Sequence, residues 1–207
     1  VKNLRHTRKK PLVFNQYGTG CPFMDIGHIL ASQAWGADGV VCTSSTTGAV
    51  SYTNAGAGNT MYIGRASDAH ATAGTLIVYD RLIHSDSLSG IVTTAQTIGT
   101  PALTRSTSGD GVELWLEWTT ATGATASNVT VSYTNQAGTA GRTTVSTALI
   151  ASAPANRMQP LPLQAGDSGV QAVASLTLSA STGTAGNFGI VLMRRLCEIN
   201  IPAAALG

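Results

Sequence analysis

Charged and aromatic residues are scarce in this sequence. Only 11% of its 207 residues are charged and 5% are aromatic, whereas ordinary soluble domains carry about 25% charged residues. Lysine and glutamate, which usually cover exposed helices, are rare, while Thr, Ser, Gly, Ala and Val dominate. The composition therefore disfavours a helical protein and favours β-structure. A hydroxyl-rich surface with so little charge also suits a protein that packs against neighbours.

The three cysteines exclude a disulfide framework. Cys21, Cys42 and Cys197 are odd in number and widely spaced. No Cys-x-x-Cys pair occurs and no Cys/His cluster has the spacing of a zinc site, so neither a metal nor a cofactor is expected. We expect three reduced, mostly buried thiols in a protein made in a cytoplasm.

Long apolar runs are also missing. None is long enough to span a bilayer, so no membrane contact is expected. The basic start is followed by PLVFNQYGTG, which is not the apolar segment of a signal peptide.

Lysine is absent after Lys10, and positive charge is concentrated at the start of the chain. Five of the twelve basic residues lie in the first ten positions: Lys2, Arg5, Arg8, Lys9 and Lys10. From Pro11 onward seven arginines stand against ten acidic residues, a balance of −3. A basic tip on an acidic body predicts an arm that meets an acidic surface, although a frayed, solvated terminus is an equal alternative. The tip lacks the interleaved aromatic residues typical of RNA binding, which disfavours nucleic acid as a partner.

Residues 1–39 are expected to form an N-terminal arm, and residues 40–207 a β-rich body. Apolar residues at helical spacing predict one short helix over Met24–Trp35, although Gly27 weakens it and an irregular arm fits equally well. Such an arm can pack its aromatic side chains on the body or on a neighbouring subunit. Those aromatic residues are Phe14, Tyr17, Phe23 and Trp35.

Alternation of apolar and polar residues predicts the strands of the body. In VELWLEW (Val112–Trp118) every second residue is apolar, so that Glu113, Trp115 and Glu117 are expected on an exposed outer face. Asn128–Leu196 holds two further stretches of this kind, and residues 74–83 fit a buried strand. Long polar connections at 84–102 and 151–168 suit crossings between two sheets. We predict an all-β, jelly-roll-like β-sandwich with an extended N-terminal arm and at most one short helix.

No polar grouping predicts a catalytic site. His84, Asp86 and Ser87 are neighbours in HSDS, but residues so close on one loop seldom converge on a reacting atom, so loop polarity explains them better. Glu113 and Glu117 invite a glycosidase interpretation. Positions four apart in a strand are, however, about 13 Å apart, beyond the ~6.5–9.5 Å of inverting carboxylate pairs. A polar outer face, or a subunit interface anchored by Trp115, fits better.

Parts of the body resemble the virion structural proteins of tailed bacteriophages, the small β-rich proteins encoded among head and tail genes. The resemblance covers most of Gly74 to Leu196 and carries no enzymatic signature. The residues that carry it are VTVSYTNQAGTAGRTT, LPLQAGDSGVQAVASLTLSASTGTAGNFGIVLMRRL and GTLIVYDRLIHSDSLSG.

The resemblance implies a head decoration (cement) protein. Such a protein would have a jelly-roll body, form a homotrimer on the outer capsid surface of the virion and be made in the bacterial host cytoplasm. Its N-terminal arm would grip the major capsid protein, and no catalytic residue is implied. The expected capsid-binding residues are then Lys2, Arg5, Arg8, Lys9, Lys10, Phe14, Tyr17, Phe23 and Trp35, with Trp115 as a candidate interface residue.

Two other roles remain open at this stage. A tail or fibre component could bind host glycans through exposed aromatic residues such as Trp115 and Trp118. A shell-forming jelly-roll capsid protein would instead turn its basic arm toward packaged nucleic acid. A glycan-processing enzyme is disfavoured because the sequence offers no suitable acid–base pair.

Overall fold

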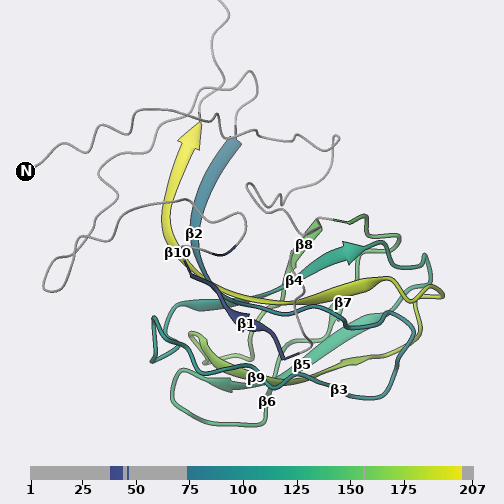
Figure 1. Ribbon diagram of the computed structural model, residues 1–207, viewed down its shortest axis with the longest axis horizontal. Coiled ribbons are helices and arrows are strands. Elements are labelled where there is room, and N and C mark those ends of the chain that lie inside the picture. The colour runs from purple at the N-terminus through teal and green to yellow at the C-terminus, as the bar shows by residue number, and fades with distance from the viewer. Residues whose placement is uncertain (1–37, 44–45, 47–73, 156, 202–207) are drawn as a thin grey trace, which may run out of the picture.

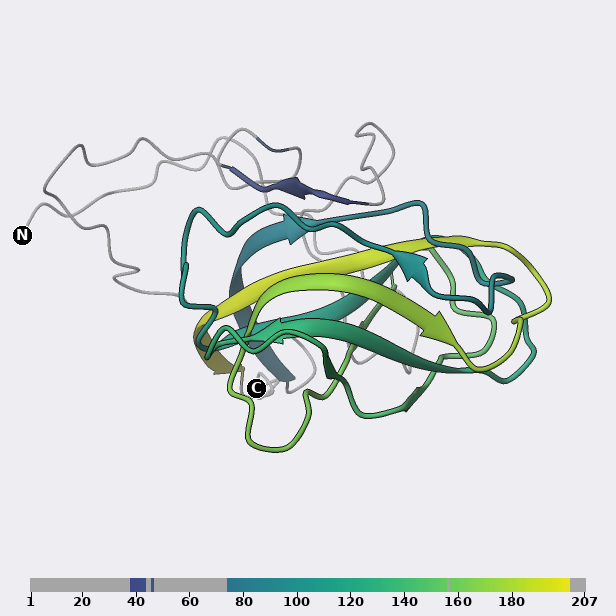
Figure 2. The same ribbon diagram turned by 90° about the horizontal axis from the view of Figure 1, so that it is seen from below.

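Two antiparallel sheets make up the structure, a computed structural model that describes residues 38–43, 46, 74–155 and 157–201 (Figures 1 and 2). Sheet 1 contains, in spatial order, β1 (Val40–Val41), β2 (Gly74–His84), β10 (Asn187–Ile201), β4 (Val112–Thr120) and β8 (Arg157–Pro160). Sheet 2 contains β3 (Gln96–Thr97), β9 (Val170–Leu178), β5 (Asn128–Asn135) and β6 (Arg142–Thr143), with β7 (Thr147–Ala148) also paired to β5.

This arrangement confirms the predicted all-β sandwich, and the described residues include no helix. The jelly-roll connectivity stays a prediction. The predicted helix over Met24–Trp35 and the basic and aromatic residues of the arm, up to Trp35, lie outside the described residues.

The core lies between the two sheets, where alternate residues of each strand meet. In β4 the inward residues include Leu116 and Trp118, both fully buried, and Trp118 packs on Phe188 of β10 with ring centroids 6.2 Å apart. In β5 the inward Val129, Val131 and Tyr133 are likewise 0% exposed. The predicted inward faces of these two strands are therefore confirmed.

Strand β9 buries residues at an irregular spacing because it contains two bulges. The residues of β9 that lie opposite every second residue of β5 are Leu176, Val173 and Val170, and a register shift separates each from the next. Each shift inserts one extra residue, which returns the next apolar side chain to the inner face. The near-alternation in the sequence is thus a strand with two bulges.

The two long connections predicted at 84–102 and 151–168 do cross between the sheets. The first leads from β2 in sheet 1 to β3 in sheet 2, and the second contains β8, which pairs with β4 at the edge of sheet 1. Pro160 ends β8, where an edge strand tolerates the missing backbone N–H.

One carboxylate fixes the loop that precedes β9. The hydroxyl of Tyr133 donates to Oδ2 of Asp167 at 2.5 Å, and Nε of Arg142 donates to the same oxygen at 2.9 Å. The side-chain amide of Asn135 donates to Oδ1 at 2.7 Å. The hydrogen bond from Arg142, followed by that from Tyr133, lowers the pKa of Asp167 from an ordinary value of 3.8 to about 2.

We expect Asp167→Asn to flatten the acid limb of the stability profile. Because the folded state lowers this pKa, the contribution of Asp167 is complete above about pH 4 and is lost as the pH falls toward 2. Urea denaturation at a series of pH values measures the slope. Tyr133→Phe should flatten it in part, and an unchanged slope in Asp167→Asn would show that the loop is held by other contacts.

Candidate functional site

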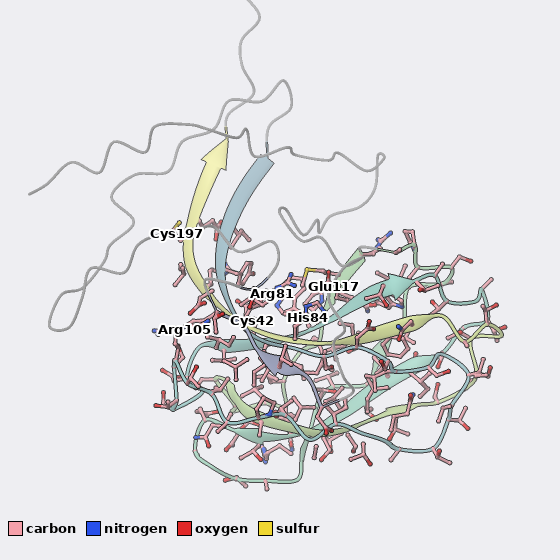
Figure 3. The ribbon with its side chains drawn as sticks, in the orientation of Figure 1. Cys42, Arg81, His84, Arg105, Glu117 and Cys197 are labelled. Atoms are coloured by element: carbon pink, nitrogen blue, oxygen red, sulfur yellow. The ribbon has the colours of Figure 1, made fainter. Side chains whose placement is uncertain are left out.

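A buried polar cluster lies on the side of sheet 1 that faces away from the core. It consists of Arg81 and His84 from β2 and Glu117 from β4, which point toward one another in Figure 3. His84 and Glu117 are 0% exposed and the Arg81 side chain is 18% exposed. The prediction that Glu117 belongs to an exposed outer face is therefore wrong, because its carboxylate is held against two side chains of another strand.

A bulge in β2 brings Arg81 and His84 to the same face. Residues three apart in a regular strand point to opposite faces. Here the pairing with β10 shifts register at Leu82, and both Leu82 and Ile83 point into the core. The extra residue returns His84 to the outer face beside Arg81.

A glycine in β10 leaves space for the backbone that follows β2, next to the cluster. Gly189 is the ladder partner of Glu117, and β10 lies between β4 and β2. A Cβ atom at this position would clash with the backbone oxygen of Ser85. Any other residue would therefore displace the backbone that follows β2 and disturb the cluster.

The geometry fixes the tautomer of His84. Nη1 of Arg81 lies 2.8 Å from Nδ1 of His84, and a guanidinium can only donate, so Nδ1 is the acceptor. In the neutral ring the proton then sits on Nε2, which faces Oε2 of Glu117 at 3.5 Å. The Arg81 guanidinium is also 3.5 Å from this oxygen. The three side chains thus form a buried ion pair bridged by a neutral imidazole.

Arg105 holds the edge of sheet 1 beside this cluster. From the connection between β3 and β4, its Nε and Nη2 donate to the two carboxylate oxygens of Asp80 at 3.0 and 2.9 Å. Its guanidinium also donates to the backbone oxygens of Cys42, at 2.8 Å, and Arg81, at 3.0 Å. A planar fork suits such multiple contacts, and these join β2 to the chain just after β1.

Cys42 lies close to these charges but is not an activated nucleophile. Burial raises the pKa of its thiol to about 11, and this outweighs the opposite effect of Arg81 and Arg105. Cys42 and Cys197 are both free thiols, the first buried and the second partly buried.

A second cluster on the same face surrounds Trp115. This indole packs edge-on against Tyr79 with centroids 6.0 Å apart, and it joins Met158, Val191 and Met193 in a small apolar cluster. Its Nε1 donates to Glu113 at 2.9 Å, and the Tyr79 hydroxyl donates to the same oxygen at 3.1 Å.

The expected exposure of the tryptophans is wrong. Trp115 is 5% exposed, and Trp118 is fully buried in the core between the sheets. Neither offers the open aromatic platform that a glycan-binding site of a tail fibre would need. The role of Trp115 at a subunit interface remains a prediction.

The chemistry of these clusters is that of internal contacts. Arg81 occupies Nδ1 of His84, and the Cys42 thiol keeps its proton, so the cluster lacks the activated nucleophile of a hydrolytic site. In the part of the chain that the structure describes, no group of three or more His, Cys, Asp or Glu side chains could hold a metal ion. The same residues contain no helix suited to crossing a bilayer.

Sequence reasoning missed the role of His84 and Arg81. The sequence predicts that HSDS is a polar loop, whereas His84 is the last residue of β2 and its side chain is buried. An arginine three positions before a histidine in one strand predicts two side chains on the same face only if a β-bulge lies between them. The sequence gives no sign of that bulge. The predicted capsid-binding residues from Lys2 to Trp35 are not among the described residues.

Comparison with models of protein families, with curated proteins and with solved structures gives no match for this chain.

We expect Glu117→Gln to destabilise the fold by about 3 kcal/mol, because it removes the fully buried carboxylate charge that faces the largely buried guanidinium of Arg81. The matched control is Glu198→Gln, which breaks an exposed pair with Arg195 and should cost less than about 1 kcal/mol. Chemical denaturation of both variants measures the difference. Equal losses would mean that the buried pair contributes no more than a surface pair.

Cys42 should resist alkylation in the folded protein. With a pKa of about 11, roughly one thiol in a thousand is ionised at pH 8, and the side chain is also buried. Iodoacetamide labelling followed by peptide mass analysis should find Cys42 unmodified in the native protein and modified in urea. Rapid native labelling would contradict this expectation.

Proposed function

We propose that this chain is a structural protein of a tailed-phage particle, which decorates the outer capsid surface and stabilises it by binding the major capsid protein. In this role it is not an enzyme and acts on the virion as a homotrimer. The N-terminal arm would bind the capsid, and the β-sandwich would serve as the body that is held in place.

The sequence resemblance over most of Gly74 to Leu196 is the observation that carries this proposal. The structure is compatible with it, because the same residues form a two-sheet body in which charged side chains pair with one another. The pairs include Arg105–Asp80 and Arg142–Asp167, each at 2.9 Å. Side chains committed to such pairs support a structural role better than a catalytic one.

The composition of the arm supports its assignment to partner binding. Each aromatic residue buried in a contact stabilises it by roughly 1.5–3 kcal/mol before ordering costs are subtracted. The basic tip adds attraction to an acidic capsid surface and accelerates encounter. An extended arm with several such anchors can bridge neighbouring capsomers.

Deletion of residues 1–20 should weaken binding to capsids by at least about 100-fold, because it removes Phe14 and Tyr17 together with the basic tip. The measurement is co-sedimentation with heads purified from a phage whose gene for this chain has been deleted. Circular dichroism should show an unchanged β-sheet body. Stoichiometric binding by the truncated protein would overturn the role of the arm.

A second variant separates charge from apolar contact. Replacing the five basic residues Lys2, Arg5, Arg8, Lys9 and Lys10 by glutamine keeps Phe14 and Tyr17. If the tip acts by attraction, this variant should bind more slowly and lose its salt dependence, yet retain more affinity than the deletion.

Electron microscopy of purified particles decides between positions in the virion. Hundreds of copies on the outside of the head fit decoration, whereas six or twelve copies fit a neck or tail role. Density within the shell itself would instead identify a shell-forming capsid protein.

A further inference from the structure

A short segment crosses the edge of sheet 1 and is held there mainly by hydrogen bonds. We call residues 38–42 the strap; it contains β1, which pairs Val40 with His84 and Val41 with Ile83 of β2. The two apolar clusters formed by the described residues include none of the strap, and Val40 is 37% exposed. A pairing of two residues at a sheet edge stabilises little by itself. Other contacts must therefore hold the strap in place.

The connection from β3 to β4 holds the strap at both ends. At one end the backbone N–H of Gly99 donates to Oδ1 of Asp38 at 2.9 Å. At the other end Nη1 of Arg105 donates to the backbone oxygen of Cys42 at 2.8 Å (Figure 3). The backbone N–H of Cys42 in turn donates to the backbone oxygen of Leu82 in β2 at 2.9 Å. The strap is thus fixed between β2 and this connection.

The connection is a firm support for these contacts because its own apolar side chains lie in the core. Ile98 is 0% exposed and Leu103 is 8% exposed. The guanidinium of Arg105 is also paired with both carboxylate oxygens of Asp80, and it donates to the backbone oxygen of Arg81. One side chain therefore ties the strap to two parts of the sandwich.

A glycine sets the path of the strap. Gly39 has a φ of +76°, and a Cβ atom at this position would lie 2.8 Å from the backbone oxygen of His84. Glycine combines this conformation with so close an approach to another backbone, whereas other residues would be strained. The strap therefore follows the end of β2 closely at this point.

We propose that the strap opens and closes as a unit while the sandwich stays folded, and that Arg105 is the residue that holds it closed. Segments with few buried apolar contacts open locally at a lower free energy than the core. Loss of the Arg105 side chain removes a donor from the backbone oxygens of Cys42 and Arg81 and an ion pair from Asp80. The contacts between the two sheets do not involve these groups, so the core should stay intact.

Opening of the strap changes the point from which the N-terminal arm leaves the body. The predicted arm, residues 1–39, joins the body through the strap, so a closed strap fixes the start of the arm at the edge of sheet 1. Release of residues 38–42 lengthens the tether by up to about 17 Å and lowers the effective concentration of the arm at its binding site. Arg105 is in this sense a positioning residue. This consequence rests on the proposed function, whereas the opening of the strap does not.

The thiol of Cys42 provides the test, because it is buried while the strap is closed. Peptide mass analysis measures the rate at which iodoacetamide labels Cys42 in the full chain, with the partly buried Cys197 as the internal reference. Arg105→Gln should raise the labelling rate of Cys42 at least about tenfold, the factor expected for a lost hydrogen bond from a charged group, and leave that of Cys197 unchanged. The matched control is Arg195→Gln, which breaks a surface ion pair with Glu198 and should be labelled like the original protein.

Hydrogen exchange separates opening of the strap from unfolding of the whole protein. In Arg105→Gln the amides of β5 and β9 should stay as protected as in the original protein. A second variant, Asp38→Ala, removes the acceptor of the Gly99 N–H at the other end of the strap and should raise the labelling rate of Cys42 several-fold. Unchanged labelling in both variants would overturn the proposal, as would faster labelling matched by an equal loss of protection in β5 and β9.

Capsid binding is a separate measurement. Arg105→Gln should weaken binding to capsids several-fold, less than the deletion of residues 1–20, because the arm keeps its anchors and loses only its fixed start. Normal capsid binding by Arg105→Gln with fast labelling of Cys42 would overturn the positioning role. Fast labelling of Cys42, together with normal capsid binding by the deletion, would instead support the strap and overturn the role of the arm. Failure of the strap and failure of the proposed function are therefore distinguishable.

Discussion

The pairing of β10 with two other strands is the constraint on which the rest of sheet 1 depends. This strand of 15 residues pairs with β4 along its first half and with β2 toward its end. Its inward side chains Phe188, Ile190 and Leu192 are fully buried in the core. Its outward positions include Gly189, the ladder partner of Glu117, where the missing side chain leaves room for the backbone of Ser85, which follows His84. Strand β10 thus sets the distance and register between β4 and β2, the two strands that supply the buried polar cluster.

The few charged residues of the body are largely committed to contacts within the chain. Arg105 joins Asp80 to two backbone oxygens, Arg142 joins Asp167, and Arg81 meets Glu117. Pairs of this kind hold loops and strand edges in one arrangement. They also leave large parts of the surface, above all sheet 2, covered by hydroxyl groups instead of charges.

The polar cluster of Arg81, His84 and Glu117 is held by contacts within sheet 1, and burial keeps the proton on the Cys42 thiol beside it by raising its pKa to about 11.

The sequence by itself determined the fold class and the inward residues of β4 and β5, because alternation in a regular strand decides directly which side chains meet a core. It also located the long crossings, since turn residues and polar composition interrupt the alternation. Only the tertiary structure decided that the side chains of Glu117, Trp115 and His84 are buried. Their burial depends on a bulge at Leu82, on a glycine in a strand distant in sequence and on the register of β10 against two partners. Alternation reports the face on which a residue lies, but what covers that face is set by pairing between residues far apart in the chain.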